Sequence, residues 1–252
     1  MTKNNNPLYD ALLLIKSAKT DIQTANAQIS AFNSLQPYGV VNEVDSKTGE
    51  IVAKARIQMA IPDDIRMFIR SAADKLRASL DFLASQLAIN NSKSASGVYF
   101  PIANSAQEFK GKRVREKIKK LSPAAQNFIC GLEPYKGGKG ERFWILNRIR
   151  KPGAHTHLVT IAKKASRDSV GIRNGYGGLH VPNLTDYWQS LDEGIEIIRC
   201  PPTSYWEYNF QLTVQITLGE IEAIKTEPII PLLVQFADSV EDVIISAQRL
   251  FF

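Results

Sequence analysis

Cysteine and histidine are scarce in this sequence, with two cysteines, Cys130 and Cys200, and three histidines among 252 residues. The cysteines lie seventy positions apart with no Cys-x-x-Cys spacing, which argues against a disulfide framework and favours a reducing compartment. We expect both to be small buried side chains. Long apolar runs are also missing, since the stretch at residues 11–15 is too short for a signal-peptide core or a membrane span. These absences predict a soluble cytoplasmic protein without membrane contact.

Several nucleotide-binding and catalytic motifs are absent as well. The segment "GGKGER" has the Gly-Lys of a P-loop but lacks its upstream glycine spacing and its Ser or Thr. No Gly-x-Ser-x-Gly occurs, and "GYGGLH" places His180 where a dinucleotide-binding loop needs glycine. His155 and His157 alternate as two ligands on a strand would, but no third ligand follows at short spacing. We therefore expect no cofactor and no metal site.

Positive charge is concentrated in one region. The chain has a net charge of +6 and a sequence pI of about 9.2. Residues 107–151 contain thirteen Lys or Arg against four Glu, a local net charge of +9, so the rest of the chain sums to −3. A regional excess of this kind indicates an anionic partner such as RNA or another polyanion.

Apolar residues recur every three or four positions over three long segments, which predicts helices at 8–34, 62–89 and 228–250. Two β-branched runs between residues 39 and 57 flank a Gly-bearing loop and predict a hairpin. The β-rich segments "HLVTIA", "SVGIR", "GIEIIRC" and "YWEYNFQLTVQITL", with the turn signal "RNGYGG", predict a small antiparallel sheet over 157–218.

The fold class expected from this order is α+β, as a single domain spanning residues 1–252. Residues 1–156 form a helical core with an inserted hairpin, residues 157–218 form the sheet, and the helix at 228–250 closes the chain. We find no internal repeat and no low-complexity linker.

The basic region is predicted to be mostly helical. "KGKRVREKIKK", residues 110–120, has seven basic residues and one acid, with Val114, Ile118 and Leu121 at helical spacing, and reads as a basic amphipathic helix. Ser122-Pro123 is a good start for a short helix ending near Gly131. "ERFWILNRI" then resumes helical spacing and must falter at Pro152-Gly153.

Charged side chains line one side of the helix predicted at 62–89. Taking about 100° per residue, they fall within a wedge of about 80° beside its apolar stripe. Arg77 and Asp81 stand at i and i+4, so they can pair. The wedge is either a solvated, salt-bridged face or a polar wall of a site. Its members are Arg66, Arg70, Asp74, Arg77 and Asp81.

The segment "NRIRKPGAHTHLV", residues 147–159, gathers Asn147, Arg150 and His155. An imidazole with a pKa near 6.5 can take a proton from a ribose 2′-hydroxyl or give one to a leaving oxygen. A permanently charged guanidinium can stabilise phosphoryl oxygens as charge develops. The alternative is structural: Asn147 links helices, Trp144 packs in the core and His155 marks a polar boundary.

Several short motifs appear in a recognisable order: "KLRASLDFLASQLA", "FPI", "LEPY" and "FWILNRIRKPGAHTHLV". Over roughly residues 8–160 this order resembles a group of uncharacterised bacterial proteins with an R-S-A-L-D helix and an L-W-x-L-N-x-L-x-N-x-D-K-H motif. Trp144, Asn147 and His155 match that motif. Lys151 replaces its Asn, and Gly153-Ala154 replaces its Asp-Lys.

The helix pair and the Arg-x4-His spacing of Arg150 and His155 are in turn similar to HEPN domains. Many HEPN domains are metal-independent ribonucleases of toxin and phage-defence systems, with the Arg and His at a dimer interface. The resemblance therefore implies RNA cleavage and a homodimer. Because Pro152-Gly153 interrupts the helix, the spacing alone does not bring the two side chains together.

Two functions follow from these observations. In the first, an RNA-cleaving or RNA-binding protein uses Arg150, His155 and Asn147 as its catalytic set, supported by Arg77 and Asp81. In the second, a non-enzymatic helical module binds a nucleic acid, a nucleotide or a protein partner. In both, the basic region contacts the ligand. We define the basic surface as Lys110, Lys112, Arg113, Arg115, Lys117, Lys119, Lys120, Lys136 and Lys139.

Overall fold

The computed structural model describes residues 6–150, 158–164, 189–191, 194–201, 212–218, 224 and 227–252. The chain divides into two compact units. The helical unit comprises Met1–Asn26, Asp64–His155 and Ile230–Phe252, and the sheet unit comprises Ala27–Asp63 and Thr156–Ile229. No helix within these described ranges combines the length and the apolar character that crossing a membrane requires.

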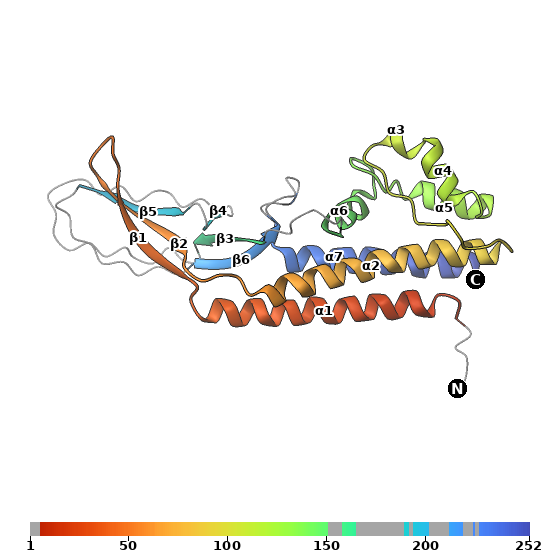
Figure 1. Cartoon of the computed structure of the whole chain (residues 1–252), viewed down its shortest axis with the longest axis horizontal. Coiled ribbons are helices and arrows are strands. Elements are labelled where there is room, and N and C mark those ends of the chain that lie inside the picture. Colours follow the sequence, from red (N-terminus) through yellow and green to blue (C-terminus); the bar gives the residue numbers. More distant parts are fainter. Residues whose placement is uncertain are drawn as a thin grey trace. The chain divides into compact units, whose positions relative to one another are not determined.

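Three long helices run side by side in the helical unit: α1 (Tyr9–Ser34, up to Asn26), α2 (Asp63–Asn90) and α7 (Ile229–Phe251), as Figure 1 shows. Their bounds confirm the three long helices predicted from the sequence. Buried α1 side chains alternate at spacings of three and four, the pattern of helices that pack at a small crossing angle. These α1 side chains are Ala11, Ile15, Ala18, Ile22 and Ala25.

Polar contacts fix the register of these three helices. The fully buried Ser79 of α2 donates its hydroxyl to the Ala11 carbonyl oxygen on α1 at 3.0 Å. Lys75 Nζ lies 2.6 Å from Asp21 Oδ2. Between α1 and α7, Lys19 Nζ lies 2.7 Å from Glu241 Oε2. The buried serine matters most, because a buried hydroxyl without an acceptor is destabilising.

Four shorter helices follow α2: α3 (Ala106–Phe109), α4 (Lys112–Ile118), α5 (Pro123–Gly131) and α6 (Glu141–Arg150). The predicted start of α5 is confirmed, because the Ser122 side chain accepts a hydrogen bond from the Ala125 amide. The end of α6 is confirmed as far as Arg150, and Pro152-Gly153 lies outside the described residues.

The prediction of one continuous basic helix over residues 110–120 is wrong. Lys110 closes α3, and Gly111 adopts an extended conformation (φ −75°, ψ 167°) as the N-cap of α4. A Cβ at Gly111 would lie 3.0 Å from the Glu108 carbonyl oxygen, so the chain passes closely at this point. The predicted apolar edge is nevertheless correct, since Val114, Ile118 and Leu121 are buried.

The described residues of the sheet unit form two three-stranded sheets. One has the order β1 (Tyr38–Val44), β2 (Ile51–Ile57), β5 (Ile195–Cys200), and both of its pairings are antiparallel. The other has the order β4, β3, β6, also antiparallel. Its strands are β4 (Gln189–Ser190), β3 (Leu158–Lys164) and β6 (Leu212–Leu218).

These sheets confirm the α+β class and the hairpin, with one correction. The sequence predicted that all strands in 157–218 form one small sheet, but β5 leaves that sheet and pairs with β2 of the hairpin. Buried Ala53 and Ala55 of β2 pack with Ile195 and Ile198 of β5 in a shared apolar cluster, which explains the pairing. The predicted strand at 169–173 and the turn at 173–178 lie outside the described residues.

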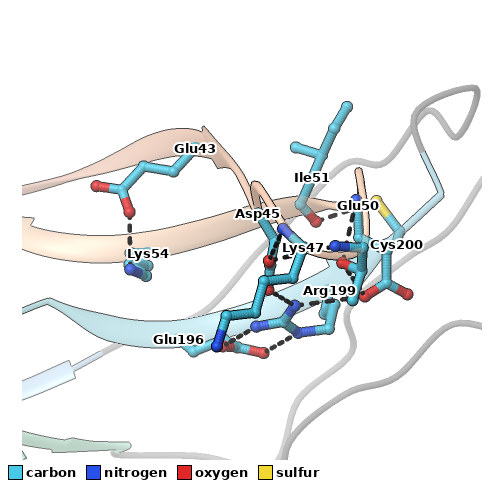
Figure 2. Close-up of polar contacts among 10 residues, drawn as sticks. Glu43, Asp45, Lys47, Glu50, Ile51, Lys54, Glu196, Arg199 and Cys200 are labelled. Carbon is cyan, nitrogen blue, oxygen red and sulfur yellow. Dashed lines mark hydrogen bonds and ion pairs between the residues drawn. The ribbon is translucent and has the colours of Figure 1, made fainter.

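A cluster of charges ties the hairpin loop to β5 (Figure 2). Arg199 Nη1 lies 2.6 Å from Asp45 Oδ2 and 3.3 Å from Glu50 Oε2, while its Nη2 lies 3.1 Å from Glu196 Oε2. The Arg199 guanidinium holds the pKa of Asp45 below its usual range. Gly49 closes the loop with φ 71°, a conformation that favours glycine.

The two cysteines differ in their surroundings. They form no disulfide with each other. Cys200 is buried as predicted, but Cys130 is exposed, which corrects the second half of that expectation. On α5, the neighbouring Ile129 faces the core, so the next residue points away from it.

Candidate nucleic-acid interface

Arg77 and Asp81 of α2 hold the chain where it returns past the helix. Arg77 is only 6% exposed, and its Nη2 donates to the Phe100 carbonyl oxygen at 2.8 Å. Asp81 Oδ1 accepts from the Phe100 amide at 3.0 Å and lies 2.5 Å from Arg77 Nη1. The i,i+4 pair anticipated from the sequence therefore forms, and it grips both backbone groups of one residue. We call this arrangement the Phe100 clamp.

The Phe100 clamp holds a charged guanidinium in a buried position. Burial lowers the pKa of Arg77, and the charge of Asp81 acts in the opposite direction. Arg77 Nε has no hydrogen-bond acceptor among the described residues. A buried guanidinium needs its carboxylate partner, because an uncompensated buried charge is strongly destabilising. Arg77 and Asp81 therefore stabilise the fold. Their support of a catalytic site stays a prediction.

The chain beyond Phe100 forms one wall of a pocket of about 170 Å³. Helices α3, α4 and α6 supply the remaining walls. We call it the α4–α6 pocket. Arg113 and Lys117 reach it together because residues four apart lie on the same face of a helix, as do Trp144 and Asn147 at a spacing of three. Its polar and aromatic side chains are Asn104, Glu108, Arg113, Lys117, Trp144 and Asn147.

Three of these side chains form a relay. Trp144 Nε1 donates to Asn104 Oδ1 at 3.2 Å. The Asn104 backbone amide and its Nδ2 both donate to Glu108 Oε2, at 2.8 and 2.9 Å. The backbone hydrogen bond from Asn104 is the main reason that the pKa of Glu108 is lowered, so this carboxylate is ionised at neutral pH. The relay orients the indole ring and occupies one carboxylate oxygen.

The other three side chains are available to a ligand. Arg113, Lys117 and Asn147 make no side-chain hydrogen bond or ion pair with any residue in the described part of the chain. Lys117 is half-buried. Burial lowers the pKa of Lys117, and the positive charges of Arg113 and Arg77 lower it further. A half-buried ammonium between like charges is stabilised by an incoming anion.

The other members of the basic surface lie outside the wall of the pocket. Lys110, Lys112 and Arg115 are exposed and form no ion pair with a described residue. Two of the other lysines are partly neutralised, Lys119 by Glu116 at 2.5 Å and Lys139 by Glu133 at 3.6 Å. Exposed pairs of this kind are weak and exchange readily for a phosphate.

Two further cations of the region lie close to Trp144. Lys136 Nζ lies 5.6 Å from the centre of the indole ring, and the Arg148 guanidinium carbon lies 6.0 Å from it. Lys120 Nζ instead donates to the Ser96 carbonyl oxygen at 2.6 Å. The indole ring thus gathers positive charge beside the pocket.

The predicted catalytic set is only partly covered by the described residues. Asn147 lines the pocket, whereas Arg150, three positions later on α6, pairs with Asp74 of α2 through Nε at 3.3 Å. Both partners of that pair are about half exposed, at 46% and 48%. His155 lies outside the described residues, so its distance from Arg150 stays untested.

Sequence reasoning missed the roles of Asn104 and Glu108. The available signal was "NSAQE", in which Ser105 caps α3 by accepting from the Glu108 amide. Among the described residues, no group of three or more His, Cys, Asp or Glu side chains is arranged to hold a metal ion. His157 and His180 are not among those residues.

Comparison with models of protein families, with curated proteins and with solved structures found no match in any of the three. The resemblances noted in the sequence therefore remain hypotheses, and function rests on the chemistry of this site.

Proposed function

We propose that this protein binds RNA through the basic surface around the α4–α6 pocket. The observation that carries the proposal is a set of donors that have no side-chain partner among the described residues: Arg113, Lys117 and Asn147 in the pocket, and Lys112 and Arg115 elsewhere on α4. Lys and Arg contacts to phosphates release condensed counterions, which supplies most of the affinity of sequence-independent binding.

Single-stranded RNA suits the site better than an acidic protein surface does. A pocket with an indole ring and a free amide offers contacts to a base or sugar that a carboxylate-bearing helix does not use. Trp144 and Asn147 supply that ring and that amide. An acidic surface without aromatic side chains would engage the basic side chains and leave the indole ring and the amide unused.

The triple variant Lys110→Met, Lys112→Met, Arg115→Met tests the proposal. All three side chains are exposed and lie outside the pocket wall. We expect the affinity for a 12-nucleotide single-stranded RNA to fall roughly tenfold or more, with the slope of log K against log salt reduced by about 2. Fluorescence anisotropy at several salt concentrations measures both quantities.

The matched control removes three positive charges elsewhere: Lys16→Met, Arg70→Met, Lys93→Met. These side chains are also exposed and make no ion pair with a described residue. The control should change the slope little. Equal losses of RNA affinity in the two triple variants would show that RNA is attracted by the overall charge of the protein, and this result would overturn the proposal. Polyglutamate of equal charge competing as well as RNA would instead identify a protein partner, and preference for single-stranded DNA would replace RNA as the ligand.

The ribonuclease hypothesis makes a separate prediction. If Arg150 and His155 cleave RNA, wild-type protein in excess EDTA should produce fragments with cyclic phosphate ends, and His155→Ala should produce none while binding RNA normally. His157→Ala is the matched control and should cleave. RNA fragments produced by His155→Ala would contradict the catalytic role of His155. If the wild-type protein produces no fragments, the ribonuclease hypothesis is rejected and the RNA-binding proposal is unaffected. The homodimer implied by the HEPN resemblance also stays a prediction.

A further inference from the structure

We infer that the α4–α6 pocket is a subsite for a phosphate monoester, so that the protein recognises the phosphorylated end of an RNA strand. The inference rests on the proposed function and adds a ligand group to it. Arg113 and Lys117 come from one helix face and Asn147 from another helix, and they meet in one pocket. Such convergence of donors from separate elements is what distinguishes a pocket from a uniformly basic surface.

The size of the pocket limits what enters it. Its volume of about 170 Å³ is well below the range of about 300–1,000 Å³ that is typical of pockets enclosing whole small ligands. A phosphate group with part of its sugar fits that space, whereas a whole nucleotide must leave its base outside. Trp144 lies in the wall of the same pocket and supplies an aromatic ring on which a base can stack.

The number of donors matches the end group better than an internal linkage. A phosphate monoester has three terminal oxygens and about −1.5 to −2 charge at pH 7, whereas a diester has two free oxygens and one charge. Arg113, Lys117 and Asn147 provide three donor groups, two of them cationic. The negative charge of Glu108 repels an anion, but one of its carboxylate oxygens already accepts two hydrogen bonds from Asn104.

The charges around Lys117 predict how recognition depends on pH. Burial and the charges of Arg113 and Arg77 lower the pKa of Lys117, while Asp81 and Glu108 act to raise it. Lys117 therefore loses its proton at a lower pH than exposed lysines do, which ends recognition on the alkaline side. On the acid side the monoester becomes a monoanion below about pH 6. The preference for a phosphorylated end should follow a bell-shaped pH profile.

The test compares three RNAs of one sequence, bearing a 5′-phosphate, a 3′-phosphate or hydroxyl groups at both ends. Wild-type protein is expected to bind one or both phosphorylated forms about tenfold or more tightly than the hydroxyl form, because hydrogen bonds to charged groups are the stronger kind. Lys117→Met should remove this preference, and Asn147→Ala should reduce it. Lys112→Met is the matched control, on the same helix but outside the pocket wall, and should weaken all three RNAs equally.

The outcomes separate this inference from the proposed function. Equal affinity of wild-type protein for all three RNAs, with the basic-surface triple variant still weakened, overturns the subsite and leaves RNA binding intact. If no RNA binds, titration with adenosine 5′-monophosphate and adenosine decides. If adenosine 5′-monophosphate binds, adenosine does not, and Lys117→Met abolishes the binding, the phosphate subsite is retained and RNA is rejected as its ligand. If neither compound binds, both the subsite and the proposed RNA binding are rejected.

Discussion

An Arg77→Met variant is expected to lose about 3–5 kcal/mol of unfolding free energy, the usual effect of breaking a buried ion pair by removing one partner. Methionine keeps much of the apolar length of the side chain, but the hydrogen bond to the Phe100 carbonyl oxygen disappears. Asp81 then remains in place with its charge uncompensated by Arg77. Denaturant unfolding followed by far-ultraviolet circular dichroism measures the loss.

The control is Arg70→Met, on the same helix and exposed, where a change of about 0.5 kcal/mol or less is expected. A second test adds Asp81→Asn to Arg77→Met. Residues that share one network show non-additive effects, so the double variant should lose less than the sum of the two single variants. Additive losses, or an Arg77→Met effect no larger than that of Arg70→Met, would contradict the clamp.

The helices of this protein could be predicted because their information is local. The three- and four-residue spacing that buries Ala11, Ile15 and Ala18 is visible in the sequence, as is the i,i+4 spacing of Arg77 and Asp81. The sequence does not show which groups this pair binds. Its acceptor and donor are backbone groups of Phe100, nineteen or more positions away along the chain, and nothing in a local pattern specifies that contact.

Strand pairing was the weaker part of the prediction for the same reason. Ile195–Cys200 was recognised as a strand, but its partner is a hairpin some 140 residues earlier in the chain. The packing of buried side chains of β2 and β5 in one apolar cluster sets this pairing, and a local sequence pattern does not specify it. The break at Gly111 interrupts a run whose apolar spacing fits one helix, and the close approach of the chain to the Glu108 carbonyl oxygen there leaves no mark in that spacing.

In the candidate site, too, local features could be predicted from the sequence and long-range contacts could not. The basic run and the pair Trp144 and Asn147 were both singled out in the sequence, but as separate features. The fold brings Lys117 and Asn147 into one pocket, and Asn104 and Glu108 complete it. The Arg150–His155 pair is the catalytic centre in only one of the two hypotheses drawn from the sequence, and its arginine is paired with Asp74.

Phe100 connects the clamp to the pocket, and its replacement has the other large expected effect. The ring is fully buried and contacts Phe143 of α6 edge to face, with centroids 6.0 Å apart. Phe143 precedes Trp144, so this contact helps to hold the helix that presents Trp144 and Asn147 to the pocket. The backbone of Phe100 is meanwhile gripped by Arg77 and Asp81. One residue therefore stabilises α2 packing and pocket geometry together.

Phe100→Ala is expected to lower the unfolding free energy by about 3–5 kcal/mol, because it removes a large buried ring and leaves a cavity. Tyr99→Ala is the matched control: the neighbouring ring is 53% exposed, so the expected loss is about 0.5 kcal/mol or less. Phe100→Leu should recover part of the loss by refilling the space. Under conditions where Phe100→Ala is still folded, its preference for phosphate-ended RNA should fall more than that of Tyr99→Ala. Equal stability of the Phe100→Ala and Tyr99→Ala variants would show that the Phe100 ring does not join α2 to α6.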